Sequence, residues 1–305
     1  MKKFIFYVEY LALKVVFLFL GILPWEVALK IGEGCGIFLT LVLAKRFKRS
    51  VYDIQRVFPE KSEKEVKEIA KESWRNIGRI LAETAQISLM SKEKMLKRIE
   101  FINFDNLIKE NHAGKPTILH MGHFVNWELF AVAGSTLFKN MLSVGKPQTN
   151  PYVNKAINDL RTKYGSKVTS SYNPFFTCMK ALKQGAMLGI VSDQSVISSP
   201  LYMNFLGRPA EVAPMTAFLS LKLNVPVYPI RMYRKNSKVY AEAYDPILPP
   251  QEKFSHELLI KYTEQLKNIY EDWIRKDPAS WLWAHNRWKR EKKCLQKMKE
   301  AGYVK

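Results

Sequence analysis

The chain has 305 residues, of which 47% are hydrophobic and 12% aromatic. This composition excludes a disordered chain and is enough for one large α/β domain or two smaller domains with a sizeable core. The formal net charge of +20 favours an anionic partner: a membrane surface, a phosphorylated lipid, an acidic carrier protein or nucleic acid. Cys35, Cys178 and Cys294 are widely separated and form no CxxC pair, so neither a disulfide framework nor a zinc site is expected.

The N-terminal segment is strongly apolar. Residues 4–25 contain only Glu9 and Lys14 as charged residues, and the segment is just long enough to span a bilayer as a helix. A second apolar run at 36–44 is too short to span alone. A secretory signal is the alternative, but no small-residue cleavage site follows and the apolar character resumes after Trp25. We therefore expect a retained membrane anchor.

Basic residues follow the second apolar run and recur near the C-terminus. The first group is Lys45, Arg46, Lys48, Arg49 and Arg56, and eight Lys or Arg follow Asn286. Basic residues beside an apolar segment stay on the cytoplasmic side and attract anionic headgroups. The alternative is a pair of solvated charge runs. We expect a membrane protein whose main body lies on the cytoplasmic face.

The middle of the chain changes from helical to alternating patterns. Ser62 and Glu65 form a capping box that opens an amphipathic helix. From about residue 115, short apolar runs alternate with helical stretches. Strands are expected at 116–121, 141–145, 167–171, 186–193, 225–234 and 238–246, and helices at 124–138, 152–165, before Gly185, at 212–223 and at 256–276.

This alternation predicts an α/β fold with a largely parallel sheet flanked by helices, and an antiparallel final pair of strands. The absence of repeats and low-complexity linkers in the sequence suggests three regions. They are a membrane anchor with its basic flank (1–50), a helical region that packs on the main domain (51–112), and an α/β main domain with a basic tail (113–305).

The most informative stretch is GHFVNWE at 122–128. His123 would lie on the loop after a strand and Glu128 in the first turns of the next helix, at the strand end where open α/β sheets place their active sites. A histidine base can take a proton from an attacking hydroxyl, and a carboxylate on its other ring nitrogen would fix the tautomer. By itself the spacing is a weak signal, because a packed histidine and a solvated glutamate would look the same.

Two other chemistries are not expected. His120 and His123 form an HxxH pair, but the pair lies at a strand-to-loop boundary and no HExxH is present, so we expect no metal. The sequence contains no GxSxG nucleophile elbow, and we see no glycine-rich nucleotide loop. No cofactor is indicated.

Six ordered motifs resemble the lipid A biosynthesis (late) acyltransferase family, within the wider glycerolipid acyltransferase group. They are VFPEKS (57–62), HFVNWE (123–128), NKAINDLRTKYG (154–165), SDQ (192–194), FLGRPAEV (205–212) and DPASWLWAHNRWKR (277–290). The resemblance implies an acyltransferase at the cytoplasmic face of the bacterial inner membrane that takes a fatty acyl chain from acyl carrier protein or acyl-coenzyme A. The acceptor would be a hydroxyl of an anionic, phosphorylated glycolipid at the membrane surface, and nucleic acid would not be a partner.

The resemblance also implies roles for single residues. His123 would be the base and Glu128 its partner. Substrate-binding residues would be Asn126, Arg161, Asp193, Gln194, Gly207 and Arg208, with Arg208 meeting phosphate or shaping the acceptor loop. The tryptophans Trp281, Trp283 and Trp288 fit packing or an interfacial belt better than catalysis.

This chain departs from the family pattern at two places: Val125 stands where the family usually has glycine, and the loop SVISSPLY (195–202) lacks an expected glycine. These departures leave the acceptor open. A lysophospholipid, another glycolipid such as a phosphatidylinositol mannoside, and an ornithine-type lipid are alternatives. Thioester hydrolysis and a non-catalytic membrane-binding or nucleic-acid-binding protein are the remaining ones.

Overall fold

A computed structural model describes residues 2–195 and 199–303. The described residues form a central sheet of seven strands. Their order is β1 (Ile99–Ile102), β9 (Lys238–Ala243), β8 (Val227–Lys235), β2 (Thr117–Met121), β5 (Met187–Val191), β3 (Met141–Gly145) and β4 (Lys167–Ser170). Neighbouring strands run parallel except β8 and β9, which are antiparallel. The predicted mostly parallel α/β sheet with an antiparallel pair is confirmed.

Helices cover both faces of the sheet, because both faces of its central strands are apolar. On β5, Met187 belongs to one buried cluster, while Leu188 and Ile190 belong to another. The connecting helices are α6 (Asp105–His112), α7 (Trp127–Gly134), α8 (Pro151–Arg161), α9 (Phe175–Lys183), α10 (Met215–Leu223) and α11 (His256–Lys276). The short 3₁₀ helix η1 (Pro278–Ser280) and α12 (Glu291–Glu300) complete the C-terminal part.

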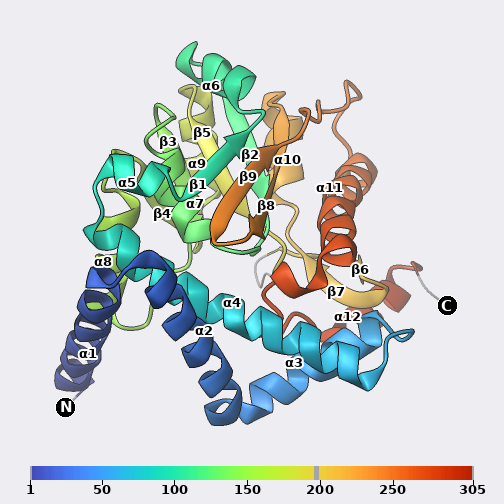
Figure 1. Ribbon diagram of the computed structural model, residues 1–305. Coiled ribbons are helices and arrows are strands. Elements are labelled where there is room, and N and C mark those ends of the chain that lie inside the picture. The colour runs from blue at the N-terminus through green and yellow to red at the C-terminus, as the bar shows by residue number, and fades with distance from the viewer. Residues whose placement is uncertain (1, 196–198, 304–305) are drawn as a thin grey trace.

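The N-terminal third is mainly helical and contains α1 (Lys2–Ile22), α2 (Trp25–Val42), α3 (Ala44–Val57), α4 (Glu63–Leu89) and the short α5 (Lys92–Leu96). Helix α4 lies between the sheet and the helices α2 and α3 (Figure 1). Both bonds of the predicted capping box are present at Ser62 and Glu65 at the start of α4. Helices α2 and α4 approach closely at two glycines, since a Cβ on Gly78 would lie 1.8 Å from the carbonyl oxygen of Gly32.

Helix α1 is apolar and also forms hydrogen bonds with the rest of the protein. Among the described residues it is long and apolar enough to cross a membrane, and α2 with α3 would qualify only as a pair bent by 96°. The Asn150 Nδ2 atom donates to the Phe6 carbonyl (2.7 Å) and to Glu9 (2.9 Å). The Gln86 side chain donates to the Leu20 carbonyl at 2.6 Å. One polar residue of the apolar segment, Glu9, therefore has a partner on the α/β domain.

The structure differs from the sequence prediction in several places. Helix α7 ends at Gly134, short of the expected 138, and α8 ends at Arg161, short of the expected 165. The region described from the sequence as helical, 51–112, also contributes β1 to the central sheet. Residues expected to form a loop instead make a hairpin of β6 (Leu201–Phe205) and β7 (Arg208–Val212). Its two turn residues, Leu206 and Gly207, both have positive φ, 52° and 78°, and the first position has leucine where Asn, Asp or Gly is usual.

Candidate active site

The site forms where two neighbouring parallel strands end. Strands β2 and β5 pair with Met121 opposite Val191. His123 and Asp193 each lie two residues beyond those positions, so their side chains meet at the same edge of the sheet. His123 Nδ1 lies 2.7 Å from Asp193 Oδ1.

Asp193 is buried and ionised. Trp281 Nε1 donates to its second oxygen, Oδ2, at 2.6 Å. Burial alone would raise the pKa of Asp193, but the charge of protonated His123 and the bonds from His123 and Trp281 outweigh it and lower the pKa. The His123 side chain is 20% exposed whereas that of Asp193 is fully covered. The imidazole is therefore the group of this pair that a substrate can reach.

The expected bond between Glu128 and His123 is not formed, and that prediction is wrong in its geometry. Glu128 accepts two bonds from Arg161 instead: Nε to Oε2 at 2.8 Å and Nη2 to Oε1 at 2.5 Å. Glu128 lies in the first turn of α7 and faces α8, whose last residue is Arg161. Burial would lower the pKa of Arg161, but the Glu128 carboxylate outweighs it and raises the pKa.

Trp127 connects the two pairs. Its ring packs edge-on against the His123 imidazole with centroids 4.7 Å apart, and its Nε1 donates to Glu128 Oε1 at 3.1 Å. Arg161 also lies against the end of β3, where a Cβ on Gly145 would be 2.6 Å from Nη1. The ends of β2, β5 and β3 thus gather an imidazole–carboxylate pair and a guanidinium–carboxylate pair around one indole.

The other residues predicted to bind substrate are placed differently. Asn126 is fully buried, and its side-chain oxygen caps α7 by accepting from Leu129 N at 2.9 Å. Gln194 follows Asp193, and its Nε2 is buried without a hydrogen-bond partner among the described residues. Gly207 occupies the β6–β7 turn. Residues 196–198 of the SVISSPLY loop lie outside the described residues.

Arg208, expected to meet phosphate, is occupied by protein partners. It is 5% exposed, and Nη1 donates to Asp53 at 2.7 Å while Nη2 donates to Glu291 at 2.9 Å. Its guanidinium also lies 4.1 Å from the centroid of the Trp288 ring. This arrangement favours a structural role that joins the hairpin to α3 and α12.

The second histidine of the HxxH pair lies in the core. His120 Nε2 contacts the Leu266 carbonyl and Nδ1 the Tyr270 hydroxyl, both at 3.0 Å. Burial lowers the pKa of His120 to about 4, so the ring is neutral at physiological pH. The two histidines therefore have separate partners.

Two residues near His123, Trp281 and His285, were not predicted as site residues. Burial of Trp281, Trp283 and Trp288 confirms the predicted packing role, but Trp281 also donates a hydrogen bond to Asp193. The pKa of His285 is lowered to about 4 by burial and then by the charge of His123. Only knowledge of which strand ends are adjacent would have pointed to these contacts.

The C-terminal basic run is only partly a surface feature. Arg287 is 2% exposed and its guanidinium lies 4.5 Å from the centroid of the Phe205 ring. Arg290 pairs with the buried Glu211. Part of the charge expected to meet a membrane is thus used inside the protein.

Comparison with known proteins identifies the family. Residues 2–290 match the family model described as bacterial lipid A biosynthesis acyltransferase. The chain is 22% identical to a lipid A biosynthesis acyltransferase of Haemophilus influenzae over 216 residues, covering 70% of this chain and 68% of that one. It is 24% identical to a lipid A biosynthesis lauroyltransferase of Escherichia coli over 278 residues, covering 88% and 87%.

A solved structure was also matched, the 1-acyl-sn-glycerophosphate acyltransferase of Thermotoga maritima. It has a TM-score of 0.36 and 15% identity, and the match covers 78% of this chain and 97% of that one. Because the family model spans nearly the whole sequence, the chain belongs to the bacterial lipid A biosynthesis acyltransferase family.

Proposed function

We propose that this acyltransferase moves a fatty acyl chain from acyl carrier protein or coenzyme A to a hydroxyl of a phosphorylated glycolipid, most simply a lipid A precursor, with His123 as general base. The observation that carries the proposal is the 2.7 Å contact between His123 Nδ1 and Asp193, which leaves Nε2 as the ring nitrogen for the substrate. The acyltransferase class comes from the family, whereas the donor, the acceptor and the residue roles are proposed.

In the proposed reaction the acceptor hydroxyl attacks the thioester carbonyl carbon while its proton passes to His123 Nε2. The imidazolium is stabilised by the Asp193 carboxylate, as in a Ser-His-Asp triad without the serine. The tetrahedral intermediate then collapses, the carbon–sulfur bond breaks, and the thiolate takes the proton back from His123. The products are the acylated lipid and the free thiol, and the histidine is regenerated.

Glu128 and Arg161 would act beside this pair. A guanidinium held by a carboxylate through two bonds is fixed in position, and its charge is partly compensated. We infer that they shape the substrate-facing wall next to Trp127, whose ring touches His123. Glu128 would therefore be a binding or orienting residue, and Asp193 would take the role first assigned to Glu128.

The N-terminal helices support action at a lipid surface. On α1, Phe4, Val15 and Ile22 are 71%, 68% and 69% exposed. The end of α2 exposes Phe38, Leu41 and Val42, and four exposed basic residues follow at once: Lys45, Arg46, Lys48 and Arg49. Apolar side chains beside basic ones fit the boundary between acyl chains and anionic headgroups.

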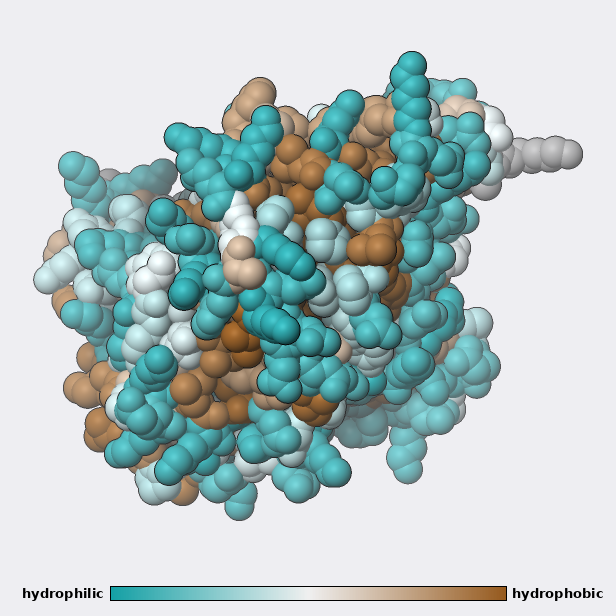
Figure 2. All heavy atoms as spheres, turned by 90° about the horizontal axis from the view of Figure 1, so that it is seen from above, coloured by the Kyte–Doolittle hydropathy of each residue, from teal (hydrophilic) through white to brown (hydrophobic). Residues whose placement is uncertain are grey.

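A different face of the molecule contrasts with these helices. The surface seen from above the α6 end carries mainly hydrophilic side chains, broken by small apolar areas (Figure 2). This contrast supports seating through α1 and α2 with the sheet turned toward water. The basic residues after α2 favour the cytoplasmic side of the inner membrane.

The test is transfer of a labelled acyl chain from acyl carrier protein, and separately from coenzyme A, to a lipid extract in the presence of full-length protein. We expect a labelled lipid, and a rate about 10²–10⁴ lower for a folded His123→Ala variant. Mass spectrometry of lipids from cells lacking the protein would identify the acceptor through one missing chain. Label appearing as free fatty acid without acceptor would indicate a thioesterase, and full transfer by His123→Ala would reject the proposed base.

A further inference from the structure

A buried carboxylate lies directly behind the loop that carries His123. Glu83 of α4 is fully buried, and its Oε2 accepts a hydrogen bond from Asn126 Nδ2 at 2.8 Å. The other end of the same amide, Oδ1, accepts from Leu129 N at 2.9 Å and caps α7. Asn126 thus stands between α4 and the helix that begins with Trp127 and Glu128.

Glu83 determines which way round this amide lies. A carboxylate can only accept, and the Leu129 N–H can only donate. If the amide were reversed, Asn126 would turn its oxygen toward Glu83 and its NH₂ group toward the Leu129 N–H, and both bonds would be lost. The ionised carboxylate also makes a stronger bond to the amide than a neutral acceptor would.

The loop needs such a restraint because its backbone is strained. Val125 has φ of +47°, a conformation that β-branched residues rarely adopt and that persists only when the surroundings impose it. The C-terminal segment holds the loop from one side: Val125 N donates to the Ser280 carbonyl at 3.1 Å, and Leu282 N donates to the His123 carbonyl at 3.2 Å. The Asn126–Glu83 contact holds it from the side of α4.

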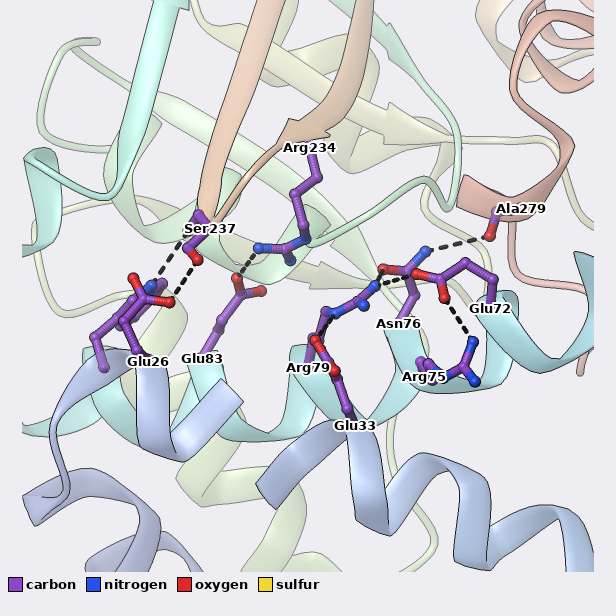
Figure 3. A network of polar contacts seen from close by, with 11 residues as sticks. Glu26, Glu33, Glu72, Arg75, Asn76, Arg79, Glu83, Arg234, Ser237 and Ala279 are labelled. Atoms are coloured by element: carbon purple, nitrogen blue, oxygen red, sulfur yellow. Dashed lines mark hydrogen bonds and ion pairs between the residues drawn. The ribbon is translucent and has the colours of Figure 1, made fainter. Parts of the chain in front are cut away.

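The charge of Glu83 is balanced by Arg234 of β8, whose side chain points toward α4 (Figure 3). Arg234 Nη1 lies 2.6 Å from Glu83 Oε1, as an ion pair without the alignment of a hydrogen bond, and the Arg234 side chain is 12% exposed (Figure 3). The guanidinium lines a polar cleft between α2, α4 and the β8–β9 turn, which Val125 also lines. The chain of contacts therefore runs from this cleft through Arg234, Glu83 and Asn126 to the catalytic loop.

We propose that Glu83, with Arg234 as its counter-ion, is a positioning residue for acyl transfer: it orients the Asn126 amide and so fixes the loop of His123 and the first turn of α7. This inference rests on the proposed site at His123. Among the described residues Glu83 has no hydrogen bond or ion pair with His123 or Glu128, and it would act through Asn126.

The test exchanges donor and acceptor across the contact. Asn126→Asp keeps an oxygen to cap α7 but sets two carboxylates against each other, and a displacement of the loop by about 1 Å would lower kcat about 100-fold. In the double variant Asn126→Asp with Glu83→Gln, the glutamine NH₂ donates to the aspartate and the cap is retained. We expect kcat of the double variant to return to within about tenfold of the parent, a residual deficit of about 1.4 kcal/mol.

Rates are measured at saturating acceptor and divided by the folded fraction from thermal unfolding. Glu72→Gln is the matched control, because Glu72 is also on α4, pairs with Arg79 and lines the same cleft. We expect kcat of this control to stay unchanged. A purely structural role for Glu83 would change the unfolding temperature but not kcat per folded molecule.

Full kcat in folded Asn126→Asp, or no recovery in the double variant, would overturn the inference. If Asn126→Asp does not fold, recovery of both folding and rate in the double variant still supports the contact, and folding without rate overturns it. His123→Ala is assayed in parallel: if it remains active, the proposed base fails, whereas an inactive His123→Ala with a fully active Asn126→Asp rejects only the positioning role.

Discussion

The imidazole of His123 and the carboxylate of Asp193 are in contact although 70 residues separate them in sequence, at 2.7 Å between Nδ1 and Oδ1. Because this carboxylate selects the tautomer with a free Nε2, Asp193→Asn should lower kcat by about 10⁴, as the wrong tautomer does in serine proteases. The loss should appear in kcat rather than in acceptor KM. Steady-state acyl transfer by the folded variant checks this, and a loss below about tenfold would contradict a triad-like role.

The Glu128–Arg161 pair should behave as one unit. Glu128→Gln and Arg161→Met each remove a bidentate contact between side chains that are only 14% and 16% exposed. We expect each single variant to lose activity, and the double variant to lose about as much as the worse single one, with a coupling energy of about 1–3 kcal/mol. A double-mutant cycle on kcat/KM measures this. Additive losses would mean that the two side chains act independently.

Arg208 should matter for folding more than for phosphate. Arg208→Ala leaves Asp53 and Glu291 without their buried cation, which typically costs about 3–5 kcal/mol of unfolding free energy. Chemical denaturation measures the cost. The acceptor KM of the folded variant should be unchanged, and a large rise in KM with normal stability would restore the phosphate-binding role implied by the family resemblance.

At position 125, glycine should give a more stable protein than alanine, the reverse of the usual order. Both replacements remove a buried side chain that is 2% exposed, but only glycine relieves a φ of +47°. The left-handed conformation costs an L-residue about 1–2 kcal/mol. We therefore expect Val125→Gly to be more stable than Val125→Ala by about 1 kcal/mol, because alanine still bears the cost of the positive φ and glycine does not. Urea unfolding of the two variants measures this difference. If Val125→Ala were the more stable of the two, the loop would have relaxed and the strain would be absent.

Acid should weaken the fold through His120. Its pKa is about 4 when folded, against 6.5 as the ordinary value. Between those values the unfolded chain binds a proton that the folded chain does not, so stability is fully present above pH 6.5 and falls as the pH drops toward 4. The loss at about pH 5.5 should be about 1 kcal/mol from this residue. The urea midpoint of His120→Gln should decline less steeply with falling pH than that of the parent. An equal decline in both proteins would show that His120 is not the cause of the acid sensitivity.

The sequence was informative about elements whose signals are local. The Ser62–Glu65 capping box, the helix at 256–276 and the antiparallel final strand pair all follow from periodicity and caps, and all are present. The β6–β7 hairpin was missed because its turn uses Leu206 at positive φ. Strand β1 was missed because its four residues depend on pairing with β9, far along the chain.

The structure brings four of the predicted site residues together, but in a different pairing. His123, Glu128, Arg161 and Asp193 were all singled out, yet the nearest carboxylate in sequence was taken as the partner of the base. The helix sends Glu128 toward α8, while the parallel register of β2 and β5 brings Asp193 to the imidazole. Strand order is set by long-range packing, which one sequence does not reveal.

Asn150 connects the N-terminal helix to α8. Its side-chain oxygen caps α8 by accepting from Tyr152 N at 3.0 Å, while its nitrogen donates hydrogen bonds to Phe6 and Glu9 of α1. Because α8 ends at Arg161, these bonds link the apolar helix α1 through α8 to the proposed active site. If α1 enters the lipid as proposed, its depth would set the height of His123 above the membrane, and the acceptor hydroxyl would have to reach that height.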